Sequence, residues 1–207
     1  MNRNAPGFAE AENQVKISHF TRKGYDIKGV IHIGVNEGYE MPRYLAMGIE
    51  NVIGVDPLAS VHEVGRRIGI PTYQCALGNE LERASLIVTK DPGGSSLLFP
   101  TFHQPVKSME VIVLTFYDLV EIAGIDLSKF DCLVLDVQGY ELEVLKGMGH
   151  LLMGFKFLNI ECSMNVDHGY EGAPAAEEVI DYVAEFGFRQ DSPICKHDDI
   201  MFIKEGL

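Results

Sequence analysis

The chain has 207 residues, 46% of them hydrophobic and 23% charged, which excludes a disordered chain and suits one globular α/β domain. Its formal net charge of −13 disfavours nucleic acid and anionic membranes as partners, because an acidic surface repels phosphate groups. No apolar run approaches the roughly 20 residues of a membrane-spanning helix, and the first thirty residues hold no apolar block typical of a secretory signal. We therefore expect a cytoplasmic protein.

The cysteines are too far apart to form the C-x-x-C pairs of metal or redox sites. Cys132 and Cys162 fall inside predicted strands, where a free thiol behaves as a small buried hydrophobe. We therefore predict reduced, structural thiols and no metal site at the four cysteines, which are Cys75, Cys132, Cys162 and Cys195.

The first predicted elements follow an N-terminal extension, residues 1–27, and begin a single domain, residues 28–207. A buried strand is predicted over residues 29–34, and the helix pattern after it ends at Gly48. A second strand over 51–56, a helix over 58–68 and a third strand over 71–77 continue the alternation.

The stretch 84–116 breaks this alternation of strands and helices. Residues 84–89 and 110–116 have the pattern of strands, and a loop rich in Gly, Ser and Pro separates them. We interpret the stretch as a small inserted hairpin region that can cover a site.

The last third of the chain returns to alternating strands and helices. Residues 130–136 are almost continuously apolar, which is typical of a strand buried on both faces of a parallel sheet. A helix over 141–152, a strand over 155–161, a helix over 175–186 and a short strand over 200–203 follow. The whole pattern predicts a doubly wound, mostly parallel, Rossmann-like α/β sheet.

Polar residues and glycines stand where the first two predicted strands end, the edge at which open α/β sheets bind ligands. Gly34, Asn36 and Gly38 form a G-x-N-x-G turn, in which glycine lets the backbone approach a ligand closely. Asp56 ends the second strand, where an acidic side chain can accept both hydroxyls of a ribose. The alternative role of Asp56 is to cap the helix after Pro57.

Further candidates follow the third, fourth and fifth strands. Ala76 and Leu77 lie where an adenine would bind, although their sequence equally fits a plain turn. Asp136 can orient a ligand ammonium or a substrate hydroxyl, or it can cap the next helix. Glu161 places a second carboxylate at a neighbouring strand end, and two like charges there need a partner.

The order of these motifs resembles the FkbM family of methyltransferases. The most specific part is D-V-Q-G-x-E-x-x-V-L-x-G over residues 136–147, and the likeness extends over residues 28–204. The other matching motifs lie at residues 31–38, 55–57, 76–78, 95–97, 160–161, 170–172 and 186–188.

The resemblance implies a class I methyltransferase fold and S-adenosylmethionine as cofactor. It implies methyl transfer to oxygen, commonly a hydroxyl of a sugar or a small metabolite. Many members carry an acidic residue where His32 stands, and we interpret His32 as a buried packing residue. Carried onto this chain, the resemblance assigns the methionine part of the cofactor to Gly34, Asn36 and Gly38, the ribose to Asp56, the adenine to Ala76 and Leu77, and the transferring methyl to Asp136.

Methyl transfer to an alcohol releases a proton, so a general base assists it. We prefer Asp136 and Glu161 as catalytic residues, because strand ends fix their positions. Three loop histidines, His103, His168 and His197, are the alternatives. The oxygen-bearing set of Asp136, Gln138, Asn159 and Glu161 could bind Mg²⁺, but we expect no metal dependence.

Two other functions share part of this pattern. An NAD(P)-dependent Rossmann oxidoreductase would use Asp56 equally well, but the chain lacks the G-x-G-x-x-G turn and carries the extra Asp136 motif. A non-catalytic module that binds S-adenosylmethionine is the second alternative, since fold alone does not secure function.

Overall fold

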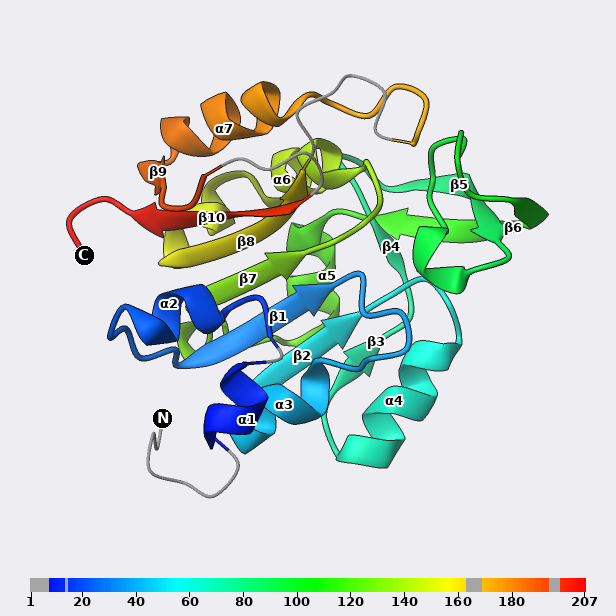
Figure 1. Cartoon of the computed structure of the whole chain (residues 1–207). Coiled ribbons are helices and arrows are strands. Elements are labelled where there is room, and N and C mark those ends of the chain that lie inside the picture. Colours follow the sequence, from blue (N-terminus) through cyan, green and yellow to red (C-terminus); the bar gives the residue numbers. More distant parts are fainter. Residues whose placement is uncertain (1–7, 14, 163–168, 194–197) are drawn as a thin grey trace.

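A seven-stranded sheet forms the centre of the molecule in the computed structural model, which describes residues 8–13, 15–162, 169–193 and 198–207. The five strands from β3 to β8 run parallel, and β10 is antiparallel to both of its neighbours (Figure 1). In sheet order the strands are β3 (Thr72–Tyr73), β2 (Asn51–Val55), β1 (Gly29–Ile33), β7 (Cys132–Leu135), β8 (Phe157–Cys162), β10 (Asp198–Lys204) and β9 (Phe188–Gln190).

Helices cover both faces of this sheet. Because side chains alternate along a strand, β1 sends Val30 into one hydrophobic cluster and Ile31 into the other. The first cluster is covered by α1 (Phe8–Glu12), α2 (Ser18–Arg22), α3 (Met41–Ala46) and α4 (Ser60–Ile68). The second is covered by α5 (Phe116–Ala123), α6 (Glu141–Met148) and α7 (Ala176–Glu185). The doubly wound fold predicted from the sequence is therefore confirmed.

The strand order reverses between β1 and β7, because the chain moves outward to β2 and β3 before it returns to β7. At such a switch point the loops after neighbouring strands diverge and leave a crevice above the carboxyl ends of the strands. The turns after β1, β2 and β7 carry the polar residues singled out in the sequence. The fold thus brings these turns to one edge of the sheet.

A second, three-stranded sheet lies beside this edge and corresponds to the predicted insertion. It consists of β4 (Ala76–Leu77), β6 (Pro105–Leu114) and β5 (Glu82–Thr89), and β5 pairs with β6 in an antiparallel hairpin. The loop between β5 and β6, residues 90–104, contains the short 3-10 helix η1 (Pro92–Gly94) and lies close to the main sheet.

Two predicted strands differ from the structure, and some elements were not predicted. The predicted strand 71–77 is divided, because β3 pairs with β2 whereas β4 turns away to pair with β6. The predicted strand 110–116 ends at Leu114, because Thr115 caps α5: its hydroxyl accepts from the Asp118 amide, and the Asp118 carboxylate accepts from the Thr115 amide. Neither α5 nor β9 was predicted, and two short 3-10 helices, η2 (Leu127–Lys129) and η3 (Gly149–Gly154), complete the described elements.

The N-terminal segment packs onto the main sheet rather than standing apart from it. Ile17 and Phe20 are fully buried in the same hydrophobic cluster as Val30 and Val134 of the sheet. Burial of a phenylalanine side chain contributes about 1.5–3 kcal/mol, so α2 is firmly held. That a domain begins at residue 28 stays a prediction, but several described residues before it, such as Ile17 and Phe20, are part of the core.

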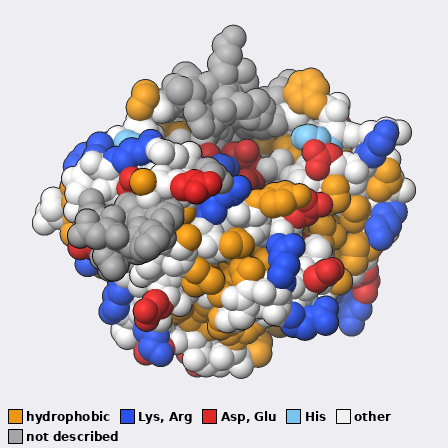
Figure 2. Space-filling model, turned by 60° about the horizontal axis from the view of Figure 1, so that its bottom comes forward, with side chains coloured by type: hydrophobic (Ala, Val, Ile, Leu, Met, Phe, Trp, Pro, Cys, Tyr) orange, Lys and Arg blue, Asp and Glu red, His pale blue; other side chains and the backbone are white. Residues whose placement is uncertain are grey.

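On the face that Figure 2 shows, Lys and Arg side chains alternate with acidic and hydrophobic ones and form no continuous basic patch. None of the described helices is long and apolar enough to span a membrane.

Candidate active site

A pocket that encloses about 710 Å³, including space open to solvent, lies at the carboxyl ends of β1, β2 and β7. We call it the donor pocket. Of the seven predicted cofactor residues, six line it: Gly34, Asn36, Asp56, Ala76, Leu77 and Asp136. The seventh, Gly38, does not line the pocket but packs against α4, where a Cβ atom would meet the side chain of Val64 at 2.4 Å.

The turn after β1 brings the backbone close to the end of β7. Gly34 has a φ of +89°, and a Cβ atom there would lie 1.7 Å from the carbonyl oxygen of Asp136. Asn36 also has a left-handed backbone, with a φ of +49°, and its side chain faces Gly93 of the β5–β6 loop. The G-x-N-x-G pattern is therefore needed for the turn itself as well as for access to the pocket.

Asp56 ties the second strand to this turn. One carboxylate oxygen accepts from the Asn36 amide at 2.7 Å and the other accepts from the Leu58 amide at 2.8 Å. Asp56 does not cap α4, whose N-cap is Ala59. Burial raises the pKa of Asp56, although the two amides act in the opposite direction. Each oxygen keeps a second lone pair, which suits the two hydroxyls of a ribose.

Beyond Asp56 the donor pocket is mostly apolar. Ala76 and Leu77 are buried in β4, and Leu86 and Leu97 line the same side of the pocket from the hairpin and its loop. An adenine ring has two apolar faces, and such a surface suits it.

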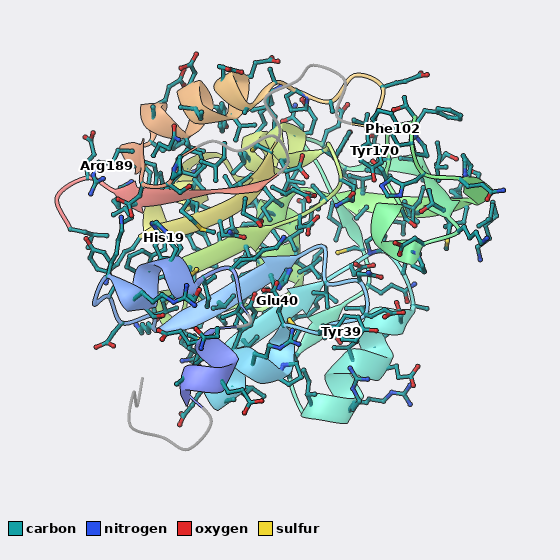
Figure 3. The ribbon with its side chains drawn as sticks, viewed as in Figure 1. His19, Tyr39, Glu40, Phe102, Tyr170 and Arg189 are labelled. Atoms are coloured by element: carbon teal, nitrogen blue, oxygen red, sulfur yellow. The ribbon has the colours of Figure 1, made fainter. Side chains whose placement is uncertain are left out.

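A second pocket of about 670 Å³ adjoins the first, and we call it the acceptor pocket. Aromatic side chains line one side of it: the rings of His103 and Tyr170 are stacked with centroids 5.9 Å apart, and Phe102 lies beside Tyr170 (Figure 3). Gln138, Gly139, Glu141 and Glu161 also line this pocket. The chain thus combines a flat aromatic surface with polar groups, although the sequence motifs predicted only part of this lining.

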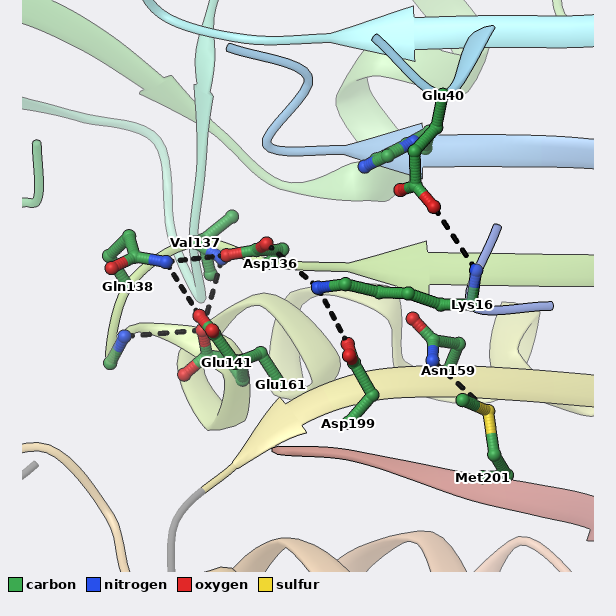
Figure 4. Close-up of polar contacts among 12 residues, drawn as sticks. Lys16, Glu40, Asp136, Val137, Gln138, Glu141, Asn159, Glu161, Asp199 and Met201 are labelled. Atoms are coloured by element: carbon green, nitrogen blue, oxygen red, sulfur yellow. Dashed lines mark hydrogen bonds and ion pairs between the residues drawn. The ribbon is translucent and has the colours of Figure 1, made fainter. Parts of the chain in front are cut away.

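The two pockets meet at Gln138, which lines both of them. Its amide nitrogen donates to Asp136 and to Glu161, each at 2.6 Å (Figure 4). Its amide oxygen accepts from the Tyr170 hydroxyl at 2.6 Å, and its backbone oxygen accepts from the Ser96 hydroxyl at 2.7 Å. Gln138 holds a left-handed φ of +58°, so the wall between the pockets is a fixed turn.

The two carboxyl groups at this junction carry different charges. Burial pushes the pKa of Asp136 upward, but the hydrogen bond with Glu161 and the ammonium of Lys16 outweigh it and hold the pKa below its ordinary value. Burial and the adjacent negative charge of Asp136 raise the pKa of Glu161 well above its ordinary value. At neutral pH Asp136 is therefore ionised and Glu161 is protonated.

Asp136 does not cap the helix that follows it, which was its alternative role. That helix, α6, has Tyr140 at its N-cap without a side-chain bond. The buried Glu141 carboxylate instead accepts from the amides of Val137 at 3.0 Å and Gly139 at 3.1 Å. Burial raises the pKa of Glu141 to about 7. Glu141 thus fixes the turn, and the Asp136 carboxylate is left free for the junction.

Sequence reasoning missed the cation that compensates these carboxylates. Lys16 precedes α2, and its ammonium lies 3.4 Å from Asp136 and 3.0 Å from Asp199 of β10 (Figure 4). The one available signal was the pair of like charges at neighbouring strand ends, which required a partner without indicating its position.

The histidines singled out in the sequence have different positions in the structure. His32 is 4% exposed, and its ring nitrogen lies 3.2 Å from the hydroxyl of Tyr44. Burial lowers the pKa of His32, so the ring is neutral, and it packs against Tyr44 of α3. His103 lines the acceptor pocket, whereas His168 and His197 lie outside the described residues.

Within the described ranges, no group of three or more His, Cys, Asp or Glu side chains is arranged to hold a metal ion. The amide nitrogen of Gln138, rather than its oxygen, points at both carboxylates. Asn159 is fully buried and donates to the sulfur of Met201, so it does not reach the junction. Cys75, Cys132 and Cys162 are free thiols, and Cys195 lies outside the described residues.

A family model described as the methyltransferase FkbM domain matches residues 32–190, which is more than half of the chain. The chain belongs to the FkbM methyltransferase family. Membership confirms the resemblance seen in the sequence, together with S-adenosylmethionine as the methyl donor of this family. No curated protein sequence matches the chain.

Solved structures support the same fold for this FkbM methyltransferase. An O-methyltransferase family protein from Burkholderia thailandensis aligns with a TM-score of 0.53 and 12% identity, over 96% of this chain and 56% of that one. The protein WbdD aligns with a TM-score of 0.51 and 13% identity, over 99% of this chain and 40% of that one. The chain therefore spans only about half of the length of these two structures. At sequence identities this low, the similarity shows the fold alone.

The donor pocket fits the cofactor of the family in two respects. The buried side-chain oxygen of Asn36 has no hydrogen-bond partner within the described part of the chain, so a donor group of a ligand can satisfy it. The Asp56 carboxylate and the apolar surface from Ala76 to Leu97 suit a ribose and an adenine, respectively.

Replacing Asp56 tests this fit. We expect Asp56→Ala to weaken binding of S-adenosylhomocysteine about 10- to 100-fold, because hydrogen bonds to a charged group contribute about 1.5–3 kcal/mol. Isothermal titration calorimetry measures the change. Asp126→Ala removes an acidic side chain at the opposite end of β7 and should leave affinity unchanged. Equal affinities of the two variants would contradict the assignment.

Proposed function

We propose that this chain methylates a hydroxyl group of a sugar or a small metabolite, with S-adenosylmethionine as the donor. The observation that carries the proposal is the junction of the two pockets at Gln138, with Asp136 lining the donor pocket and Glu161 the acceptor pocket. A donor and an acceptor bound on either side of this residue would meet beside an ionised carboxylate.

When bound, the cofactor supplies a methyl group that its sulfonium already activates. The residues of this chain then have to align the acceptor and exclude water. Asp136 would accept the proton of the acceptor hydroxyl, and the amide of Gln138 holds the Asp136 carboxylate at 2.6 Å. The protonated Glu161 adds no second negative charge beside the hydroxyl oxygen.

The aromatic side of the acceptor pocket favours a ring-shaped acceptor. Phe102 is 78% exposed, and the stacked pair of His103 and Tyr170 lies next to it. Sugars place their C–H faces on such rings while their hydroxyls bond to polar groups, here Gln138 and Glu161. Acidic groups at the junction disfavour an anionic substituent next to the reacting hydroxyl.

Two measurements test the proposal. Calorimetric titration with S-adenosylhomocysteine and with NAD separates a methyltransferase from an oxidoreductase: we expect micromolar or tighter affinity for the first and no binding of the second. Transfer of a labelled methyl group from S-adenosylmethionine to a panel of sugars and hydroxylated metabolites, with and without EDTA, then tests catalysis.

We expect labelled product with at least one hydroxylated acceptor, undiminished by EDTA. Binding of S-adenosylhomocysteine without turnover on any acceptor would instead favour a non-catalytic binding module. Binding of NAD in place of S-adenosylhomocysteine would refute the proposed reaction class.

A further inference from the structure

Lys16 precedes the part of the chain that matches the family model, yet its side chain ends among the acidic groups of the active site. We propose that Lys16 is a positioning residue for methyl transfer, which keeps the Asp136 carboxylate charged and fixed at the junction of the two pockets. This inference rests on the proposed function, because it assigns a task in that reaction to a residue outside the matched domain.

The backbone around Lys16 is firmly anchored. Its amide donates to the Glu40 carboxylate at 3.1 Å, and the residues on either side, Val15 and Ile17, are buried in the hydrophobic cluster under α2. The side chain itself is 34% exposed and reaches along the end of the sheet to the junction. The lysine is therefore presented to the site by a packed segment, unlike a solvated surface lysine.

The ammonium of Lys16 bridges two strands. It lies 3.4 Å from Asp136, which follows β7, and 3.0 Å from Asp199 on β10, while β8 with Glu161 runs between these strands. One cation thus holds carboxylates on both sides of Glu161. Since the two contacts come from different strands, the bridge also restrains where the Asp136 side chain lies.

The charges around Asp136 make the cation necessary. Within the described residues, Lys16 is the only lysine or arginine in ion-pair contact with Asp136. Two adjacent carboxyl groups compete for one proton, and a cation beside one of them favours its ionised form. Lys16 is next to Asp136, so the proton remains on Glu161. The titratable and charged groups that act on Asp136 within the described residues are Lys16, His32, Asp56, Glu141, Glu161, Tyr170 and Asp199.

Lys16 does not line the donor pocket, so its role differs from cofactor binding. Its replacement should therefore change the titration of Asp136 and the pH dependence of turnover while leaving the affinity for S-adenosylhomocysteine within about threefold of the wild-type value. If Lys16 were needed only for folding, its replacement would change neither the titration of Asp136 nor the pH profile of turnover in the fraction of the variant that folds.

The test compares Lys16→Met, Lys16→Arg and the matched control Lys23→Met, which removes another lysine of the same segment, paired with Asp191 at 2.6 Å. Carbon-13 NMR of labelled aspartate carboxyls, in protein loaded with S-adenosylhomocysteine, follows the pKa of Asp136 directly, and Asp136→Asn assigns the signal. We expect Lys16→Met to raise this pKa by roughly one pH unit or more. Lys16→Arg should restore it, and Lys23→Met should leave it unchanged.

The acid limb of the pH profile of kcat should move in the same direction in Lys16→Met, because Asp136 must be ionised to accept a proton. An Asp136 carboxyl that titrates alike in Lys16→Met and in the wild type would overturn the inference. The proposed function fails separately, if the wild-type protein does not bind S-adenosylhomocysteine.

Should Lys16→Met not fold, a measurement on Asp136→Asn replaces it. The carbon-13 signal of the Lys16 side chain should then shift between the wild type and Asp136→Asn, because the variant removes one of the two anions in contact with the ammonium. An unshifted lysine signal would equally overturn the inference.

Discussion

Asp136→Asn is expected to lower turnover about 10²- to 10⁴-fold, which is the usual contribution of a positioned general base. Asparagine has the same shape, and its oxygen can still accept from the Gln138 amide that now holds the carboxylate at 2.6 Å. It cannot take up the hydroxyl proton, and it no longer attracts the Lys16 ammonium. The loss should therefore appear in kcat with the acceptor that the panel identifies.

Two further measurements separate catalysis from folding in this variant. The affinity for S-adenosylhomocysteine should change less than tenfold, and the melting temperature should fall by only a few degrees. Asp126→Asn is the matched control, since Asp126 precedes β7 at the other end of the strand and is about half exposed. Parallel losses of stability and turnover in Asp136→Asn would count against its role as the base.

Gly34→Ala is expected to destabilise the protein by about 3 kcal/mol or more. A left-handed backbone costs a residue with a Cβ atom roughly 1–2 kcal/mol, and overpacking typically adds roughly 1–3 kcal/mol. Here the φ is +89° and the added carbon would lie 1.7 Å from the Asp136 carbonyl oxygen, so β1 and β7 must separate. Urea denaturation followed by circular dichroism measures the loss.

Gly69→Ala provides the control for this prediction. Gly69 has a similar φ of +74° at the end of α4, but an added Cβ atom there would meet nothing within 4 Å. Replacing Gly69 by alanine should lower the free energy of unfolding only because of its left-handed backbone, by about 1 kcal/mol. The difference between the two variants isolates the close approach of β1 to β7. If both variants were destabilised by the same amount, the close approach of β1 to β7 would add nothing to the effect of the substitution on the free energy of unfolding.

The sequence predicted the main sheet well, because its strands are buried on both faces and appear as short apolar runs. It failed where pairing depends on distant partners. Residues 71–77 carry one continuous strand pattern, yet β3 and β4 belong to different sheets, because β3 pairs with β2 whereas β4 pairs with β6. Helix α5 was missed because Thr115 and Asp118, which form its capping box, follow directly on a strand pattern.

The candidate site was predicted on the donor side and only partly on the acceptor side. Strand ends of a parallel sheet meet at one edge, so Gly34, Asp56 and Asp136 could be placed together from their positions in the chain. The bridge from Lys16 could not be predicted, since no local pattern relates residue 16 to the end of β7. Tyr170, likewise, reaches Gln138 only through the tertiary fold.

The loop between β5 and β6 touches both pockets. Gly93 and Leu97 line the donor side, Phe102 and His103 line the acceptor side, and the Tyr170 hydroxyl bonds to the Gly94 carbonyl between them at 3.1 Å. Replacing this loop to change the acceptor therefore also changes residues that line the donor pocket. Selectivity and donor affinity in such chimeras are expected to change together, so neither can be engineered here in isolation.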